Sequence, residues 1–288
     1  MQEISVEDRI AGKYSNLSEK LRLAADFVLE NQFEVATRSL RSISATTKLA
    51  PATFSRLARS LDFESYEELR ELCRKAIGQF RVTFSQKAEL LQDLAEEGET
   101  PFLHRQANAC LTNISQVASD SDLVRLEQTA DTLTDARRVV LFGGFASTGI
   151  VEYFAYLANF FTTDWRIAGR MGASLSTAIA DLEKGDALVI ITKPPFARRS
   201  IMAAKMAAEL GVYVVVITDS YSCPALEFAS TFFIIPSESP QFFSSYVATL
   251  MLIETLVGML VARAGAAARQ RIEDVERRNR LLGEFWEG

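Results

Sequence analysis

The stretch that decides the fold spans residues 137–149 and reads RRVVLFGGFASTG. Its apolar run at 139–142 has no polar alternation, which is typical of a strand buried on both faces of a sheet. The two glycines that follow allow the backbone to turn sharply into a helix. The sequence therefore predicts a βα turn at the carboxyl end of a buried strand.

This turn is also a candidate ligand site. The first backbone N–H groups of a helix have no partner inside the helix, so they can hold an anion. Gly143, Ser147 and Thr148 are therefore candidate ligand-binding residues, through close backbone approach and hydroxyl groups. A glycine-rich turn alone is equally consistent with a βα connection that binds nothing.

Strand and helix patterns alternate after this turn. Apolar runs predict strands, and three-to-four spacing predicts helices, in the order 150–161 helix, 165–167 strand, 175–182 helix, 187–192 strand, 201–210 helix, 212–218 strand, 232–235 strand and 247–261 helix. Parallel neighbours need crossover connections, so the alternation predicts an α/β fold with a doubly wound parallel sheet over 137–262. The remaining 263–288 are expected to form a helix with one apolar side, suited to oligomerisation.

The first 82 residues have helical periodicity and predict a separate all-α bundle. Three short helices are expected at 39–49, 51–61 and 65–77. A polar stretch with Gly98 and Pro101 then predicts an interdomain joint, at the start of a helical connector over 83–136. The connector itself has helical spacing at 102–117 and 123–133.

Composition argues for an ordinary soluble protein without metal or disulfide chemistry. The chain has 288 residues, 48% of them apolar, and a net charge of −6, which argues against nucleic-acid coating along its whole length. Three cysteines without a CxxC pair predict no disulfide framework and no metal, so we expect no cofactor and a cytoplasmic location. No signal segment and no membrane span are expected, and His104 is interpreted as a surface or packing residue, not as a ligand or base.

Positive charge is concentrated in one segment of the first domain. Between Val35 and Leu61 there is no Asp or Glu, and the basic residues are Arg38, Arg41, Lys48, Arg56 and Arg59. Such a segment suits a phosphate backbone, although an exposed helix of any small bundle fits the same pattern.

A helix that begins at Pro51 is the candidate DNA-reading element. We expect its small and basic residues to lie on or beside the exposed side, namely Ala52, Thr53, Ser55, Arg56 and Arg59. Small residues would allow close approach to a major groove, and arginines a turn later would contact bases or phosphates.

Residues 39–63 resemble the helix-turn-helix of the RpiR (MurR/RpiR) transcriptional regulators. The matching segments are ATFSR at 52–56, LDF at 61–63 and YEEL at 66–69. Ala50 stands where the family has a serine cap, and Asp62 where it has a glycine. The resemblance implies that 1–82 bind a double-stranded DNA operator, through Arg41 and the five residues named above.

The second half resembles the SIS (sugar isomerase) domain, the usual partner of that helix-turn-helix. The match runs from 137 to about 260 and includes GGFAS at 143–147, VVVITD at 214–219 and CPAL at 223–226. In the family, a serine of the first loop and an S-x-S-G-x-T loop after the second strand hold a sugar phosphate. Ser147 matches the first of these, and Thr192 keeps one hydroxyl of the second.

The second loop departs from the family pattern and reads TKPPFARRS at 192–200. Two prolines and an alanine replace a serine, a glycine and a threonine, which removes backbone donors and a hydroxyl. Lys193, Arg198 and Arg199 bring positive charge to the same rim. They could hold a carboxylate, sulfonate or phosphate, or remain solvated surface charges. Aromatic residues such as Phe196 and Tyr246 would either make this pocket less polar or pack in the core.

The leading hypothesis is a transcriptional regulator, not an enzyme, whose SIS domain senses a small anionic metabolite such as a sugar phosphate or another acid. Two-fold DNA sites predict a homodimer or a dimer of dimers. One alternative is a sugar-phosphate isomerase, for which Glu238 and Glu254 are the carboxylates to consider as a base. Another is a regulator whose SIS domain has lost its ligand and only dimerises.

Overall fold

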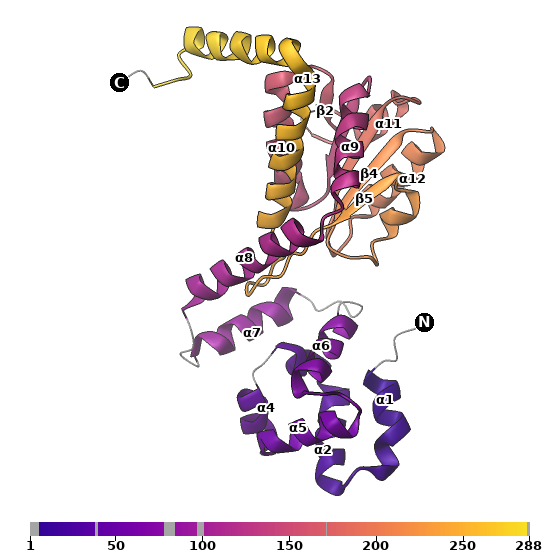
Figure 1. Cartoon of the computed structure of the whole chain (residues 1–288), viewed down its shortest axis with the longest axis vertical. Coiled ribbons are helices and arrows are strands. Elements are labelled where there is room, and N and C mark those ends of the chain that lie inside the picture. The colour runs from indigo at the N-terminus through magenta and orange to yellow at the C-terminus, as the bar shows by residue number, and fades with distance from the viewer. Residues whose placement is uncertain (1–5, 38–39, 78–83, 97–100, 171, 287–288) are drawn as a thin grey trace. The chain divides into compact units, whose positions relative to one another are not determined.

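The structure, a computed structural model, describes residues 6–37, 40–77, 84–96, 101–170 and 172–286. The chain divides into two compact units, Met1–Lys87 and Ala88–Gly288. The first is helical and the second contains a five-stranded sheet (Figure 1), so the predicted combination of a helical bundle with an α/β domain is confirmed.

The first unit is built from short helices around one apolar core. Its helices are α1 (Val6–Lys13), η1 (Tyr14–Asn16), α2 (Glu19–Glu30), α3 (Gln32–Thr37), α4 (Leu40–Thr47), α5 (Pro51–Ser60) and α6 (Tyr66–Ile77). The three helices predicted from 39 to 77 are confirmed as α4, α5 and α6, whereas α3 was not predicted. Ile43, Phe54, Leu57 and Leu69 are fully buried together, which fixes the inner face of α5.

Contacts around the turn after α5 show how an aspartate is accommodated where the family pattern has a glycine. Asp62 has a φ of 63°, in the left-handed region that favours glycine. Lys13 of α1 forms an ion pair with its carboxylate. Arg9 donates a hydrogen bond of 3.3 Å to the Leu61 carbonyl and stacks over the Phe63 ring. Helix α1 therefore holds this turn in place from both sides of Asp62.

Helix α7 (Phe84–Glu96) occupies most of the stretch in which the sequence predicts a joint. The boundary between the two units falls inside it, at Lys87–Ala88. The two connector helices are confirmed as α8 (Phe102–Asp120) and α9 (Leu123–Asp135), and both pack on the last helix of the second unit.

The sheet is parallel throughout, as predicted. Its strands are β1 (Val139–Gly143), β2 (Trp165–Ile167), β3 (Ala187–Ile191), β4 (Tyr213–Thr218) and β5 (Thr231–Ile234), in the order β2-β1-β3-β4-β5. Val139 pairs with Trp165 on one side and Ala187 on the other. Because β1 lies inside the sheet, its Gly143–Ser147 turn opens at the middle of the carboxyl edge.

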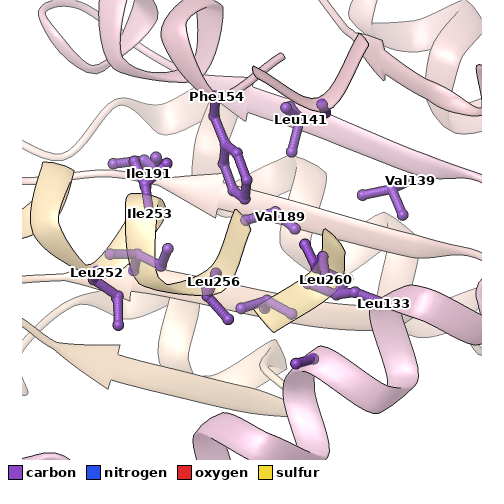
Figure 2. Close-up of a cluster of buried hydrophobic side chains, with 14 of the residues drawn as sticks. Leu133, Val139, Leu141, Phe154, Val189, Ile191, Leu252, Ile253, Leu256 and Leu260 are labelled. Carbon is purple, nitrogen blue, oxygen red and sulfur yellow. The ribbon is translucent and has the colours of Figure 1, made fainter. Parts of the chain in front are cut away.

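Helices cover both faces of the sheet, which is why the inner strands are nearly continuous apolar runs, whereas the edge strand β2 contains the exposed Arg166. One face is covered by α9, α10 (Ser147–Phe161) and α13 (Val247–Leu282), and the other by α11 (Leu175–Ala180), α12 (Arg198–Glu209) and η2 (Pro224–Phe228). Leu141 points to the first face and Phe142 to the second. Figure 2 shows Leu141 and Phe154 on one side of the first core and Leu256 of α13 across from them.

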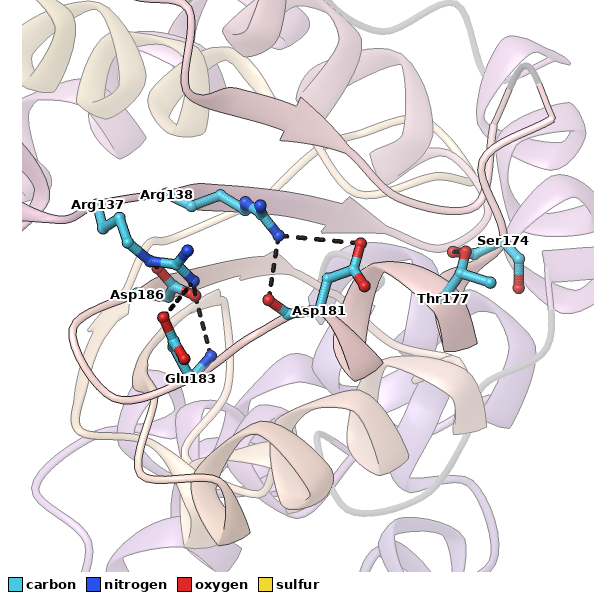
Figure 3. A network of polar contacts seen from close by, with 7 residues as sticks. All are labelled: Arg137, Arg138, Ser174, Thr177, Asp181, Glu183 and Asp186. Carbon is cyan, nitrogen blue, oxygen red and sulfur yellow. Dashed lines mark hydrogen bonds and ion pairs between the residues drawn. The ribbon is translucent and has the colours of Figure 1, made fainter.

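Charged groups at the start of β1 and β3 pair with one another (Figure 3). The Asp186 side chain is buried and accepts two hydrogen bonds from Arg137, of 3.0 and 2.7 Å. It also accepts the backbone N–H of Glu183 at 2.9 Å, and Arg138 donates to the Asp181 carbonyl. This paired carboxylate is structural, because its acceptor positions are used inside the domain.

The predicted last two helices form one element, α13, interrupted at Gly265, whose φ of 62° is not helical. The chain bends there (Figure 1), and Arg271 beyond the bend donates to the Asn159 and Thr162 carbonyls at the end of α10. Among the described residues, α13 is the one helix long and apolar enough to cross a membrane by length and composition. Leu252, Ile253, Leu256 and Leu260 nevertheless belong to the core of the second unit.

The β1–α10 turn gives a test of the packing. A Cβ at Gly144 would lie 2.5 Å from the Ala197 Cβ, whereas one at Gly149 in α10 meets nothing within 4 Å. We expect Gly144→Ala to lower the free energy of unfolding by about 1–3 kcal/mol through overpacking. The control Gly149→Ala should raise it by up to about 1 kcal/mol, because alanine favours helix.

Urea unfolding followed by tryptophan fluorescence measures this difference in the second unit alone, since both tryptophans, Trp165 and Trp286, lie there. Equal stability of Gly144→Ala and the wild type would contradict the close approach of the two loops.

Candidate functional site

The carboxyl edge of the sheet brings together most of the residues predicted to bind an effector. Ser147, the first residue of α10, is buried, and its Oγ lies 2.9 Å from the hydroxyl of Tyr246, the residue before α13. The Thr148 hydroxyl donates to the Gly143 carbonyl at 3.1 Å, so it serves the turn itself. Thr192 is buried at the end of β3, where its N–H donates to the Ile217 carbonyl.

Lys193 is the central residue of this edge. Its residue exposure is 5%, so the alternative that it is a solvated rim charge is wrong. Its Nζ donates a hydrogen bond of 2.8 Å to the Ser245 carbonyl and lies 4.5 Å above the centre of the Tyr246 ring. The side chain runs inward because Tyr246 and the preceding segment cover it, which periodicity in the sequence does not reveal.

The electrostatics of Lys193 follow from this burial. Desolvation lowers the pKa of the ammonium from 10.5 to about 8, and the negative charge of Asp219 opposes the shift. An ammonium has three N–H donors, and the Ser245 carbonyl accepts one of them. Among the residues that the structure describes, no carboxylate forms an ion pair with Lys193. Within the described part of the chain, the buried ammonium therefore feels the Asp219 charge but has no direct ion-pair partner.

The neighbours of Lys193 are polar and half-buried. Ser237 donates a hydrogen bond to the Asp219 carboxylate. Burial raises the pKa of the Tyr246 hydroxyl, an effect that its hydrogen bond with Ser147 reduces. The phenol is therefore neutral near pH 7, and it can donate or accept a hydrogen bond.

The start of α12 adds a second group of donors at the same edge. Arg198 and Arg199 are exposed in its first turn, while Ser200 is fully buried. The Ser200 hydroxyl has no hydrogen-bond partner within the described part of the chain. It lies 3.6 Å from where a Cβ of Gly144 would be, so the helix start faces the β1–α10 turn. Unpaired N–H groups of a first turn and the helix dipole favour an anion there.

The sequence missed two parts of the site. Ser245 contributes a backbone carbonyl, which no side-chain motif can signal. Asp219 ends the VVVITD segment but was not predicted as a site residue. Its position after β4, next to the end of β3, is the signal that could have identified it, because parallel strands end at a common edge.

In the first unit, α5 presents most of the residues predicted to bind DNA. Ala52, Arg56 and Arg59 are exposed on α5, Arg41 is exposed on α4, and Ser55 is half-buried. Thr53 is 4% exposed, so its predicted position on the exposed side is wrong. It lies one turn before Leu57, on the side of α5 that packs on the core.

Thr53 and Arg56 nevertheless line one hollow, of about 260 Å³, with Ser18, Glu19, Lys20 and Leu21 at the start of α2. No acidic residue occurs in α4 or α5, although Glu19 of α2 lines the hollow beside Lys20 and Arg56. Exposed arginine and small residues on one helix are the groups that phosphate and base contacts require.

No metal centre is visible in the described residues, since no three His, Cys, Asp or Glu side chains gather there. His104, predicted to be a surface or packing residue, is exposed on α8. The three cysteines are free thiols: Cys73 and Cys223 are buried, and Cys110 is half-buried.

A five-stranded parallel sheet covered by helices on both faces defines a doubly wound α/β domain. Residues 132–259 match the family model of the SIS domain, so the chain carries the predicted SIS domain.

Solved structures share this fold. The sugar isomerase domain of the RpiR transcription factor from Sphaerobacter thermophilus is 19% identical in sequence, with a TM-score of 0.57. The alignment covers 61% of this chain and 97% of that domain's chain. The Vibrio vulnificus NanR protein, complexed with ManNAc-6P, is 18% identical and covers 96% of this chain and 99% of its own, also with a TM-score of 0.57. No curated protein sequence matches the chain.

The buried ammonium predicts a distinctive pH dependence. Between about pH 8 and 10.5 the unfolded chain binds a proton that folded Lys193 has lost, so folding becomes more favourable as pH rises. We expect wild type to gain up to about 3 kcal/mol of unfolding free energy relative to Lys193→Met across this range.

Urea unfolding at pH 7, 8, 9 and 10, followed by tryptophan fluorescence, measures this gain. Lys184→Met is the matched control, because Lys184 is exposed. A stability difference between wild type and Lys193→Met that does not change with pH would contradict the burial of the charge.

Proposed function

We propose that this protein is a DNA-binding transcriptional regulator of the RpiR family whose SIS domain binds a small anionic metabolite and thereby controls operator binding. The observation that carries the proposal is the buried Lys193 ammonium, which lacks an ion-pair partner among the described residues at the ligand-binding edge of a SIS domain. The likeness in fold to RpiR and NanR supports it.

A small anion is the ligand that this edge favours. A buried charge is costly unless it is paired, so an acid beside Lys193 would recover part of the desolvation cost of the ammonium. The ammonium lies over the Tyr246 ring, whose hydroxyl pairs with the Ser147 hydroxyl, and the Ser200 hydroxyl and the start of α12 supply further donors. Arg198, exposed at the rim, would attract the anion. A sugar phosphate or another acid fits this set of donors.

DNA binding is assigned to the first unit. Helix α5 offers exposed Ala52, Arg56 and Arg59, and α4 offers Arg41, with no acidic residue in either helix. The arginines would bind phosphates and base edges of an operator, with an affinity that falls as salt rises. Thr53 would support α5 from the core side and contact DNA only through the hollow that it shares with Arg56.

A homodimer is the oligomeric state that we propose. Tyr153 and Tyr156 on α10 are exposed, and Leu281 and Trp286 at the end of the chain are 81% and 94% exposed. Apolar surface of this kind is suited to a second copy, and two copies would match a two-fold operator. We place the protein in the cytoplasm, where DNA and metabolite are both available.

Enzymatic isomerisation is the less favoured alternative. That reaction needs a positioned base at the sugar carbons. Glu254 is exposed on α13 and accepts a hydrogen bond of 2.8 Å from Tyr153. The Glu238 side chain is exposed too, and its carbonyl accepts from Asn113. Among the described residues, neither glutamate forms a hydrogen bond or ion pair with Lys193 or Ser147, and the Asp219 carboxylate at this edge already accepts a hydrogen bond from Ser237. We therefore propose a regulator without catalytic activity.

Substitution of one arginine of α5 tests the proposed DNA interface. Arg56→Ala should weaken binding to the promoter of the protein's own gene by about 1–3 kcal/mol if Arg56 contacts a base. Fluorescence anisotropy at two salt concentrations measures this loss. Arg278→Ala removes another exposed arginine, from α13, and should leave affinity unchanged. Wild-type affinity in Arg56→Ala would remove this residue from the interface.

The effector site is tested by a thermal-shift panel of sugar phosphates, carboxylates and sulfonates. An acid that raises the melting temperature of the wild type should raise that of Lys184→Met equally. It should have no effect on Lys193→Met, which lacks the buried cation. A full shift in Lys193→Met would place the effector elsewhere.

A further inference from the structure

The segment between β5 and α13, residues 236–246, is hydrogen-bonded on two sides, and we name it the bridging segment. On one side it contacts the candidate effector site, and on the other it contacts α8. Both sets of contacts lie within the second unit.

On the site side, three contacts hold the bridging segment. Lys193 donates to the Ser245 carbonyl at 2.8 Å, Tyr246 pairs with Ser147 at 2.9 Å, and Ser237 donates to Asp219. The Ser245 N–H donates to the Ser237 carbonyl at 2.9 Å, which closes the segment into a loop. Both ends of this loop are therefore held by residues of the candidate effector site.

On the other side, one face of α8 contacts the bridging segment. Gln106 accepts a hydrogen bond of 3.2 Å from the Ser239 hydroxyl, Cys110 Sγ lies 3.8 Å from Ser245 Oγ, and Asn113 donates to the Glu238 carbonyl at 2.8 Å. These residues are spaced i, i+4 and i+7, the spacing of a single helix face. Asn113 is 1% exposed, so its bond to the segment is shielded from water.

Ser245 links the two sides directly. Its carbonyl accepts from Lys193, and its hydroxyl lies beside Cys110, which in turn accepts from Gln106 at 3.4 Å. Two successive contacts, Lys193 with Ser245 and Ser245 with Cys110, therefore connect the ammonium to α8.

We propose that the bridging segment couples the occupancy of the Lys193 site to α8. An anion bound to the other N–H donors of Lys193 draws the ammonium away from the Ser245 carbonyl, which weakens the hold on the segment and changes its contacts with Gln106, Cys110 and Asn113. The coupling requires the anion to bind the released arrangement more tightly than the closed one. That an anion is the natural trigger rests on the proposed function, whereas the mechanical coupling does not.

Cys110 is a built-in reporter of this coupling. It is half-buried between α8 and Ser245, while Cys73 and Cys223 are buried. Thiol labelling of the full chain under native conditions, located by peptide mass spectrometry, gives a separate rate for each cysteine. In Lys193→Met the Ser245 carbonyl loses its donor, and we expect Cys110 to react at least about threefold faster, because the segment opens more often. Lys184→Met should match the wild type.

The reverse experiment changes α8 and observes the site. Gln106→Ala removes the Ser239 and Cys110 contacts from a half-buried position, and we expect Lys193 to be acylated at pH 8 at least about threefold faster than in the wild type. If Lys193→Met loses its native tryptophan fluorescence and is therefore misfolded, the Gln106→Ala experiment alone tests the coupling.

An unchanged Cys110 rate in folded Lys193→Met, or an unchanged Lys193 rate in Gln106→Ala, would overturn the coupling. Neither arm uses DNA or an added acid. Failure of the proposed function, seen as absent DNA or acid binding, is therefore distinguishable from failure of the coupling.

Discussion

A parallel sheet buried on both faces is the constraint on which the second unit depends. Each strand must be followed by a crossover helix, so the turns after β1, β3 and β4 all open at one edge. The polar groups of these turns meet there although they are far apart in the chain. Arg137 and Asp186, at the start of their strands, pair with each other instead. The topology thus determines at which edge of the sheet a ligand could bind, whatever side chains the turns carry.

Lys193 gives this edge its chemical character. In the family pattern that the sequence resembles, the loop after the second strand holds phosphate with hydroxyls and backbone amides. Here two prolines remove amides from that loop, Ala197 packs on Gly144, and one buried ammonium lies between the Ser245 carbonyl and the Tyr246 ring. A single desolvated cation could replace several neutral donors, because a hydrogen bond to a charged group is stronger than a neutral one.

Strong periodicity made the fold predictable from the sequence. Every strand from β1 to β5 was located to within about two residues, because buried parallel strands are uninterrupted apolar runs. Helix α3 was missed, since six residues carry little periodic signal. Thr53 was misplaced because a threonine fits either face of a helix. The burial of Lys193 was not predictable, since it depends on the bridging segment more than forty residues later, and no local pattern encodes that contact.

The central claim is that an anion binds beside the buried, partly deprotonated ammonium of Lys193, and proton-linked calorimetry tests it most directly. Titrating sulfate, which does not itself ionise in this range, at pH 8 in two buffers of different ionisation enthalpy measures the protons taken up on binding. We predict uptake of about half a proton per site, because a bound anion raises the pKa of Lys193 from about 8. Sulfate binding without proton uptake, or the same uptake in Lys193→Met, would contradict the account.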